Sequence, residues 1–214
     1  MCSGLFVACN STTKGSADEG VIEYKTEIVD SNNALGAIAP SLMVLKFKNN
    51  LLSAEMKTGM SAVGIRFISD DKKHKFTQLV RILNQKYICS ANAKNIRAIF
   101  KDTPEYDVKK VDEPKVIAGI NCQKAEIYEK GKAKHLFDVY YTDAFKLDKP
   151  NWWNEFSEID GLLMDYRMKR FNFELHFTAK KFEQIHLDSS EFKMNGNYIK
   201  ITQEELNSYF DALK

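Results

Sequence analysis

Cys9 is the residue with the clearest chemical role in this sequence. It follows the apolar run Leu5-Phe6-Val7-Ala8 and precedes a polar stretch that begins at Asn10. An apolar run that ends in a small residue directly before a cysteine is typical of the cleavage and acylation site of a bacterial lipoprotein. The run is too short to span a bilayer, which needs about 20 apolar residues. We therefore predict a signal-peptide remnant over residues 1–8 and a lipid anchor on Cys9.

The segment before Cys9 contains no Lys or Arg, although secretory signals begin with a basic region. We expect from this that the natural reading frame starts upstream of Met1. The alternative is a cytoplasmic protein whose N-terminus contains Ala-Cys by chance. The polar residues after Cys9 have the composition of a flexible tether. The expected organisation is thus a tether over residues 9–19 and a folded domain over residues 20–214.

Two further cysteines, Cys89 and Cys122, lie far apart in the sequence and form no CxxC pair. In an oxidising compartment they either form a disulfide or remain two separate buried thiols, and the sequence leaves both alternatives open. The four histidines have no metal-ligand spacing, and the GxSxG, HExxH, Walker and GxGxxG motifs are absent. We predict no metal, no cofactor and no enzymatic activity.

Charge and composition narrow the class of protein further. The chain has 214 residues, with 31 basic and 29 acidic side chains and a formal net charge of +2. This balance disfavours nucleic-acid binding, which usually requires a concentrated basic surface. The 14 Phe and 9 Tyr residues favour strands and large buried surfaces.

Alternation of apolar and polar residues with period two recurs from Gly20 onward and predicts half-buried strands. Turn residues at Asn49-Asn50 and Asn84-Gln85 join four of these segments into two hairpins. The expected strand segments are 21–29, 43–48, 52–57, 65–67, 78–83, 86–91, 116–128, 136–142 and 171–179. The predicted fold class is mainly β (α+β), with a single antiparallel sheet that curls like a half-barrel to bury its apolar face.

Few helices are expected. Thr202 and Glu205 form a capping-box pattern, and apolar residues follow at helical spacing, so we predict a helix at the C-terminus. A second, short helix is expected within residues 91–100. The apolar segment 34–42 lacks strand alternation and contains Pro40, so it forms either a short helix or a loop on the sheet.

Two apolar features are candidates for binding a hydrophobic ligand. Trp152 and Trp153 either close one end of the sheet as part of the core, line the rim of an apolar cavity or touch a membrane interface. Leu35 and Ile38, in the 34–42 segment, either belong to a packed connection or form a lid. A covered concave apolar face is suited to an acyl chain, but the sequence leaves open whether that face is hollow or filled.

The C-terminal half resembles a known family. The run Val116-Ile117-Ala118-Gly119-Ile120-Asn121-Cys122-Gln123-Lys124-Ala125 is similar to the I-x-G-x-x-C-x-K-A strand of GLPGLI-like lipoproteins and related domain-of-unknown-function proteins of Gram-negative bacteria. Residues 140–143, 159–164 and 187–192 resemble later motifs of that family, although Ile159-Asp160 replaces its proline-glycine. The resemblance implies a half-barrel of the LolA and LolB type, with helices over its concave side, and no catalytic residues.

The anchor, the curved sheet and the resemblance together predict a cell-envelope lipoprotein that binds a lipid or other hydrophobic ligand in the periplasm. The alternative is a non-enzymatic envelope scaffold or protein-interaction domain whose concave face is filled by its own side chains. Asn10 is not the Asp that retains some lipoproteins in the inner membrane, so we expect an outer-membrane anchor with the domain on the periplasmic face. The expected partners are the membrane, through the anchor, and a hydrophobic ligand or an envelope protein, with no nucleic acid.

Mass spectrometry of the mature protein from its host tests the anchor. We expect a chain that begins at Cys9 and carries the added mass of acyl chains, because cleavage and acylation occur at the same residue. A mature chain that begins with an unmodified Met1 would contradict the prediction.

Overall fold

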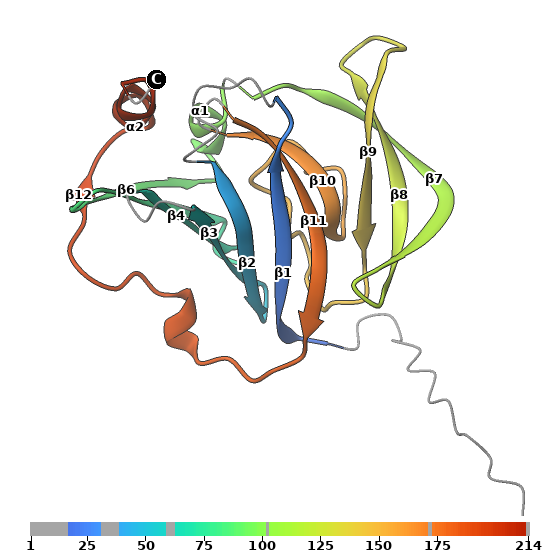
Figure 1. Cartoon of the computed structure of the whole chain (residues 1–214), viewed down its shortest axis with the longest axis horizontal. Helices are drawn as coiled ribbons and strands as arrows, with labels where there is room; N and C mark the ends of the chain where they lie inside the picture. The colour runs from blue at the N-terminus through green and yellow to red at the C-terminus, as the bar shows by residue number, and fades with distance from the viewer. Residues whose placement is uncertain (1–16, 31–38, 59–62, 102, 171–172, 213–214) are drawn as a thin grey trace, which may run out of the picture.

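A computed structural model describes residues 17–30, 39–58, 63–101, 103–170 and 173–212 of the chain. Within these residues a single 12-stranded sheet forms, in the order β12-β6-β5-β4-β3-β2-β1-β11-β10-β9-β8-β7 (Figure 1). The elements are β1 (Glu19–Ile28), β2 (Pro40–Lys48), β3 (Leu51–Thr58), β4 (Val63–Asp70), β5 (Lys75–Ile82), β6 (Gln85–Asn92), α1 (Ile96–Ile99), β7 (Tyr106–Ile117), β8 (Ile120–Glu129), β9 (His135–Thr142), β10 (Leu162–Arg170), β11 (Phe173–Glu183), β12 (Ile199–Lys200) and α2 (Gln203–Asp211). The predicted fold class, a mainly β domain with one curved sheet and a C-terminal helix, is confirmed.

The sheet curls but does not close. One edge is β7, and the other is β6 with the two-residue parallel strand β12 beside it. Figure 1 shows β2 to β6 on one side of the molecule and β7 to β9 on the other, with β1, β11 and β10 between them. Residues 93–105, which include α1, connect β6 to β7 and so link the two ends of the sheet. The natural twist of adjacent strands explains why a sheet of this width curls.

The two hairpins predicted from alternation are confirmed. In β2, Met43, Leu45 and Phe47 are buried on the inner face, and the turn residues Asn49 and Asn50 have φ values of 48° and 68°. Positive φ at both central residues is typical of the type I′ turn, which matches the twist of paired strands. The second hairpin, β5–β6, turns one residue earlier than predicted, because Ile82 pairs with Gln85.

The prediction of a single strand from Val116 through Tyr128 is wrong. Strand β7 ends at Ile117, β8 begins at Ile120, and the two residues pair with each other across a tight turn. Ala118 and Gly119 form this turn with φ values of 51° and 78°. The apolar alternation continues through a two-residue turn without interruption, so periodicity alone does not show the reversal. Val116, now near the tip of an edge hairpin, is 63% exposed.

The strand predicted over 171–179 corresponds to β11, which continues to Glu183, while residues 171 and 172 lie outside the described residues. The preceding strand, β10, was not predicted. It opens with the unbroken apolar run Leu162-Leu163-Met164, which is buried and shows no alternation. The register with β9 shifts between Leu163 and Asp165, an irregularity that interrupts the alternation of the strand at this point.

The C-terminal helix is confirmed, including its capping box. The Thr202 hydroxyl accepts a hydrogen bond from the Glu205 amide at 3.2 Å, and the Glu205 carboxylate accepts one from the Thr202 amide at 2.7 Å. The short helix expected within 91–100 is α1, a single turn. The prediction of a helix or loop over 34–42 is wrong for residues 40–42, which belong to β2, and residues 34–38 lie outside the described residues.

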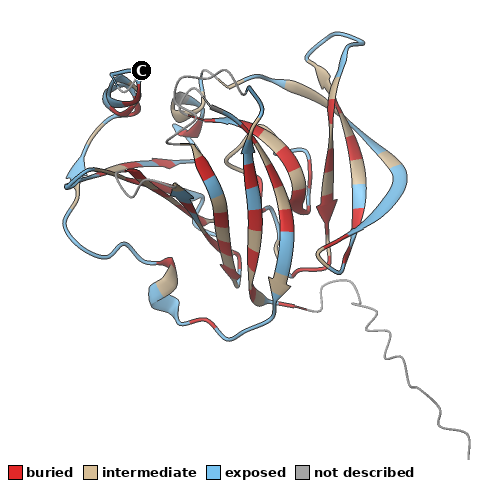
Figure 2. Ribbon diagram, viewed as in Figure 1, coloured by how far each residue is buried: buried red, intermediate tan, exposed pale blue. Residues whose placement is uncertain are grey.

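Buried residues alternate with more exposed ones along most strands (Figure 2), and the buried apolar side chains form one core cluster. The two cysteines of the domain do not form the disulfide that was one of the two alternatives. Cys89 lies on β6 and Cys122 on β8, near opposite ends of the strand order, and both are free, buried thiols. Burial raises the pKa of the Cys122 thiol to about 11. The thiols therefore behave as small buried apolar side chains.

Residues 184–198, termed the strap, cross the outer face of the sheet between β11 and β12 (Figure 1). Leu187 and Phe192 of the strap are buried, and Lys46 pairs with Glu191 at 2.7 Å. Glu19 anchors the beginning of the strap, because its carboxylate accepts a hydrogen bond from the Leu187 amide at 3.0 Å and pairs with Lys48 at 2.8 Å. The strap thus covers apolar residues on the outer face and carries the chain to α2.

Replacement of Glu19 should weaken the strap in a pH-dependent way. Hydrogen bonds from Lys48, Leu187 and His186 lower the pKa of Glu19 from 4.5 to about 2. Because the folded pKa is depressed, the stabilisation is complete above about pH 4.5 and is lost as the pH falls toward 2. We expect Glu19→Gln to lower the urea midpoint at pH 7 and the difference from wild type to shrink below pH 4.5.

Glu158→Gln, at an exposed residue, is the matched control and should leave the midpoint unchanged. A Glu19→Gln deficit of the same size at pH 7 and pH 2.5 would show that the carboxylate charge does not hold the strap.

Candidate functional site

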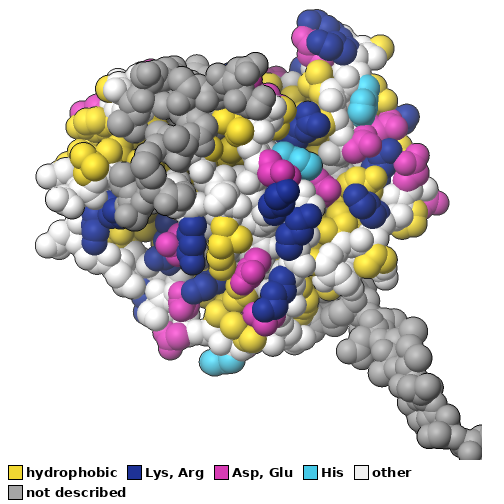
Figure 3. Space-filling model, in the orientation of Figure 1, with side chains coloured by type: hydrophobic (Ala, Val, Ile, Leu, Met, Phe, Trp, Pro, Cys, Tyr) yellow, Lys and Arg dark blue, Asp and Glu magenta, His cyan; other side chains and the backbone are white. Residues whose placement is uncertain are grey.

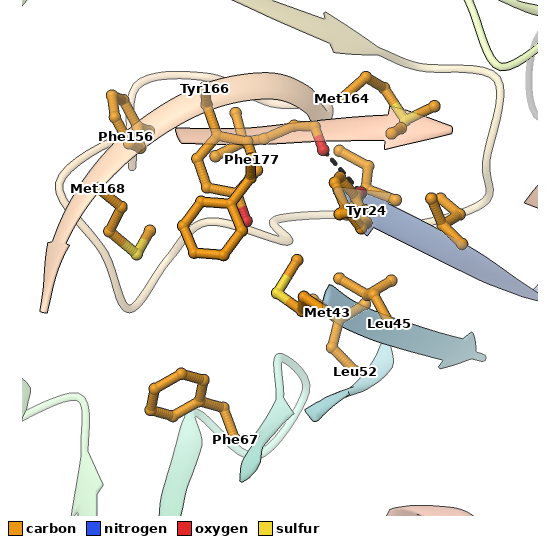
Figure 4. Packing of buried hydrophobic residues seen from close by; sticks show 14 of the residues in the cluster. Tyr24, Met43, Leu45, Leu52, Phe67, Phe156, Met164, Tyr166, Met168 and Phe177 are labelled. Carbon is orange, nitrogen blue, oxygen red and sulfur yellow. Dashed lines mark hydrogen bonds between the residues drawn. The ribbon is translucent and has the colours of Figure 1, made fainter. Parts of the chain in front are cut away.

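Residues 143–161, termed the plug, connect β9 to β10 and cover the concave face of the sheet. Phe156, at the centre of the plug, is 0% exposed and packs against Tyr106, Phe137 and Tyr166, with ring centroids 5.8–6.5 Å apart. Figure 4 shows Phe156 to the left of Tyr166 and Phe177, with side chains of β2 to β4 below them in the same cluster. Aromatic packing of this kind contributes both buried area and favourable edge contacts. The plug therefore occupies the volume that a ligand inside the sheet would need.

Buried hydrogen bonds hold the plug in place. Asn151 is 3% exposed and donates through Nδ2 to the carbonyl oxygens of Ile159 and Gly161, each at 2.8 Å. Asn50, in the β2–β3 turn, donates to the Asp148 carboxylate and accepts from the Asp148 amide, both at 2.8 Å. A Cβ on Gly161 would lie 2.7 Å from the Thr142 carbonyl oxygen, so the end of the plug has no room for a side chain. These contacts fix a long connection that contains neither a helix nor a strand.

Trp152 and Trp153 lie in the plug, where both are half-buried. Trp152 donates through Nε1 to the Ser69 hydroxyl at 2.9 Å, and its ring lies 5.3 Å from that of His74. Trp153 stacks on Phe76 with centroids 4.6 Å apart and also contacts Phe67 and Phe100. Trp153 therefore belongs to the packed interior and closes one end of the sheet. It also reaches the outer edge of the plug, termed the rim.

The space left under the plug is small. Side chains of β2, β3, β4, the plug and β10 surround an apolar cavity of about 40 Å³. Trp153, Met43, Leu52 and Tyr166 are among the residues that line it. Pockets that hold a drug-sized ligand measure about 300–1,000 Å³. The concave face is therefore filled by the protein's own side chains.

A buried ion pair lies at the rim of the plug. Arg170, the last residue of β10, donates to both carboxylate oxygens of Glu155, at 2.8 and 3.4 Å. The two side chains are 5% and 1% exposed. The Arg170 guanidinium also lies 4.5 Å from the centre of the Phe100 ring. Two-point hydrogen bonding and the aromatic contact offset part of the desolvation cost of these buried charges.

Outside this pair, the rim opens into a cleft of about 370 Å³ between the plug and the connection from β6 to β7. Trp152, Trp153 and Phe100 provide its aromatic wall. Charged residues of both signs surround it, namely Arg97, Lys101, Lys130, Glu105, Glu155 and Glu158. The cleft therefore combines aromatic surface with a balanced set of charges.

Of the predicted ligand-binding residues, the structure places Trp152 and Trp153 at this rim. Leu35 and Ile38, like the lipidation residue Cys9, lie outside the described residues. The sequence did not single out Glu155 or Arg170, because their partnership joins two segments 15 residues apart with no shared motif. Within the described residues, no group of three His, Cys, Asp or Glu side chains could hold a metal ion. No described helix is long and apolar enough to cross a membrane.

The fold defines the class of this protein, a β-rich domain built on an open, barrel-like sheet. No protein-family model and no curated protein sequence matches the chain. Among solved structures, it is similar to a β-barrel-like protein from Brucella abortus that belongs to a domain of unknown function. That likeness has 5% sequence identity and a TM-score of 0.34, and covers 81% of this chain and 100% of the other. The resemblance to the GLPGLI-like lipoproteins stays a prediction.

A double-mutant cycle tests the buried ion pair. Arg170→Met leaves the Glu155 carboxylate buried without its partner, so we expect it to lower the free energy of unfolding by about 3–5 kcal/mol. Glu155→Gln removes the uncompensated negative charge, so the double variant should be more stable than Arg170→Met alone. Urea denaturation at pH 7 measures all four proteins. Additive losses from the two single substitutions would show that the pair is not coupled.

Proposed function

We propose that this protein is a non-enzymatic protein-interaction domain of the bacterial cell envelope, held at the membrane by an acylated Cys9. The observation that supports this function over lipid carriage is the filled concave face. The plug buries Phe156 and Ile159 there and leaves a cavity of only about 40 Å³. An acyl chain could enter only if the plug left the sheet, which would break the hydrogen bonds between Asn50 and Asp148 and between Trp152 and Ser69.

The cleft at the rim supports a protein partner. Interfaces between proteins are enriched in aromatic side chains and Arg, and the cleft offers Trp152, Trp153, Phe100 and Arg97. Its charges of both signs suit a partner segment that carries complementary charges. Figure 3 shows basic and acidic side chains intermixed on the face that it displays, which is a poor match for the uniform charge of nucleic acid. We therefore assign the partner to the proteins of the envelope.

Lipid extraction distinguishes this function from lipid carriage. Cys9→Ser removes the anchor, so any lipid that co-purifies with the secreted variant would have to lie within the folded domain. We expect mass spectrometry of the extract to find no lipid at a stoichiometric level, because the interior is filled. A stoichiometric lipid would contradict the proposal and would make carriage the working function.

Site-directed photo-crosslinking in living cells gives the positive test. A crosslinker at Ser157, an exposed residue of the cleft, should capture a discrete envelope protein, whereas one at the exposed Lys134, in the β8–β9 turn, should not. Trp153→Ala should reduce the Ser157 adduct. Equal capture from both positions would argue against the cleft as the interaction surface.

A further inference from the structure

A separate cavity of about 230 Å³ lies between α2, the end of α1 and the strands β5 and β10. Its polar lining includes Gln78 from β5, Arg170 from β10 and Gln203 from α2. Phe100 and Phe210 provide apolar walls. Arg170 contributes to this cavity while it pairs with Glu155, which lines the cleft. The two spaces are therefore neighbours that share Arg170 and Phe100 as part of their boundary.

Gln78 is an exception to the pattern of its strand. Its neighbours on the inner face, Phe76 and Val80, are 0% and 1% exposed and belong to the apolar core. Gln78 is 1% exposed, and its Nε2 atom has no hydrogen-bond partner among the described protein atoms. A buried amide donor without a partner costs roughly 1–3 kcal/mol. Such breaks in an otherwise consistent pattern are expected at functional positions.

Gln203 approaches the same cavity from the opposite side. It is the first residue of α2 after the Thr202 cap, and it is 9% exposed. Its Nε2 donates to the Asn207 side-chain oxygen at 2.7 Å, one helical turn later, while its Oε1 has no partner among the described protein atoms. The bond to Asn207 orients the amide and leaves its acceptor available. The cavity therefore has an unused donor on β5 and an unused acceptor on α2.

Arg170 adds a second donor but no unbalanced charge. Its Nε is buried without a partner, whereas its two terminal nitrogens bond to the Glu155 carboxylate and the Lys169 carbonyl oxygen. Glu155 balances the guanidinium charge, and Lys169 and Asp211, one charge of each sign, also line the cavity. The lining therefore carries no net charge that would favour an ion. The lining favours an uncharged group that both accepts and donates hydrogen bonds.

We propose that this cavity binds a small uncharged ligand through an amide group. The amide carbonyl oxygen accepts from Gln78 Nε2 and Arg170 Nε, and the amide N–H donates to Gln203 Oε1. Small rotations about the last side-chain bond of each glutamine, a bond with broad torsional freedom, present these atoms to the ligand. Phe100 and Phe210 contact the apolar substituents on either side of the amide. The volume limits the ligand to a size below that of a typical drug.

Two probes of similar size test the proposal on the full chain. N-methylacetamide carries both a donor and an acceptor, whereas N,N-dimethylacetamide has lost the donor. In a ¹⁵N NMR titration, N-methylacetamide should produce saturable shifts in the side-chain amides of Gln78, Gln203 and Asn207. N,N-dimethylacetamide should bind about 3- to 10-fold more weakly, because it leaves Gln203 Oε1 without a donor.

Gln78→Met and Gln203→Met keep the length of each side chain and remove its amide. Each should weaken N-methylacetamide binding by about 3- to 10-fold. Gln78→Met should not lower the thermal midpoint of the unliganded protein, because it removes a buried donor that has no partner.

Three results would overturn the proposal. The first is no saturable shift with either probe, as expected if water alone satisfies these atoms. The second is equal affinity for the two probes, and the third is unchanged affinity in both folded variants. None of these outcomes bears on the anchor or on the protein partner at the cleft, which are tested separately.

Discussion

The wide, twisted sheet of this domain curls without closing, and this geometry governs how the rest of the chain packs. A closed barrel buries its inner face by its own geometry, whereas an open sheet must recruit other parts of the chain to cover that face. Here the plug covers the concave side, and α2 packs against the inner face near β6, where Tyr209 stacks on Tyr87 at 4.9 Å. The strap covers apolar residues on the outer face. The plug, α2 and the strap are thus each explained by a surface that the strands leave exposed.

The edges of the sheet are protected by different means. Strand β7 carries charged residues, Pro114 and a break in its register with β8 between Val111 and Lys115, features that discourage pairing with another chain. The opposite edge is shielded by β12 and the strap. The remaining opening lies at the top of the sheet in Figure 1, where α1 and α2 are found. Both the cleft and the polar cavity lie at this opening, where residues of α1 and the segment after it, such as Phe100, line both spaces.

Polar groups buried at that opening give the domain its specific chemistry. The pair of Arg170 with Glu155 is satisfied within the protein and ties the plug to the end of β10. Gln78 and Gln203 are only partly satisfied, although both are as buried as core residues. A packed interior that excludes large apolar ligands therefore coexists with a small polar cavity beside it. This combination favours recognition at the rim over storage inside the sheet.

The fold class, the hairpin at Asn49-Asn50 and the capped helix after Thr202 could be predicted from the sequence, as could a second hairpin whose turn, predicted at Asn84-Gln85, lies one residue earlier. These features depend on contacts between residues close in the chain, where periodicity, turn residues and capping side chains act directly. Alternation could not reveal the reversal at Ala118-Gly119, because a two-residue turn preserves the period, and it could not find β10, whose first residues are buried on both faces. Three features follow only from the folded chain: the concave face is filled, Cys89 and Cys122 lie apart, and Gln78, Arg170 and Gln203 share a cavity. These outcomes depend on how far the sheet curls and on which distant segments meet across it, and no local pattern in the chain specifies either.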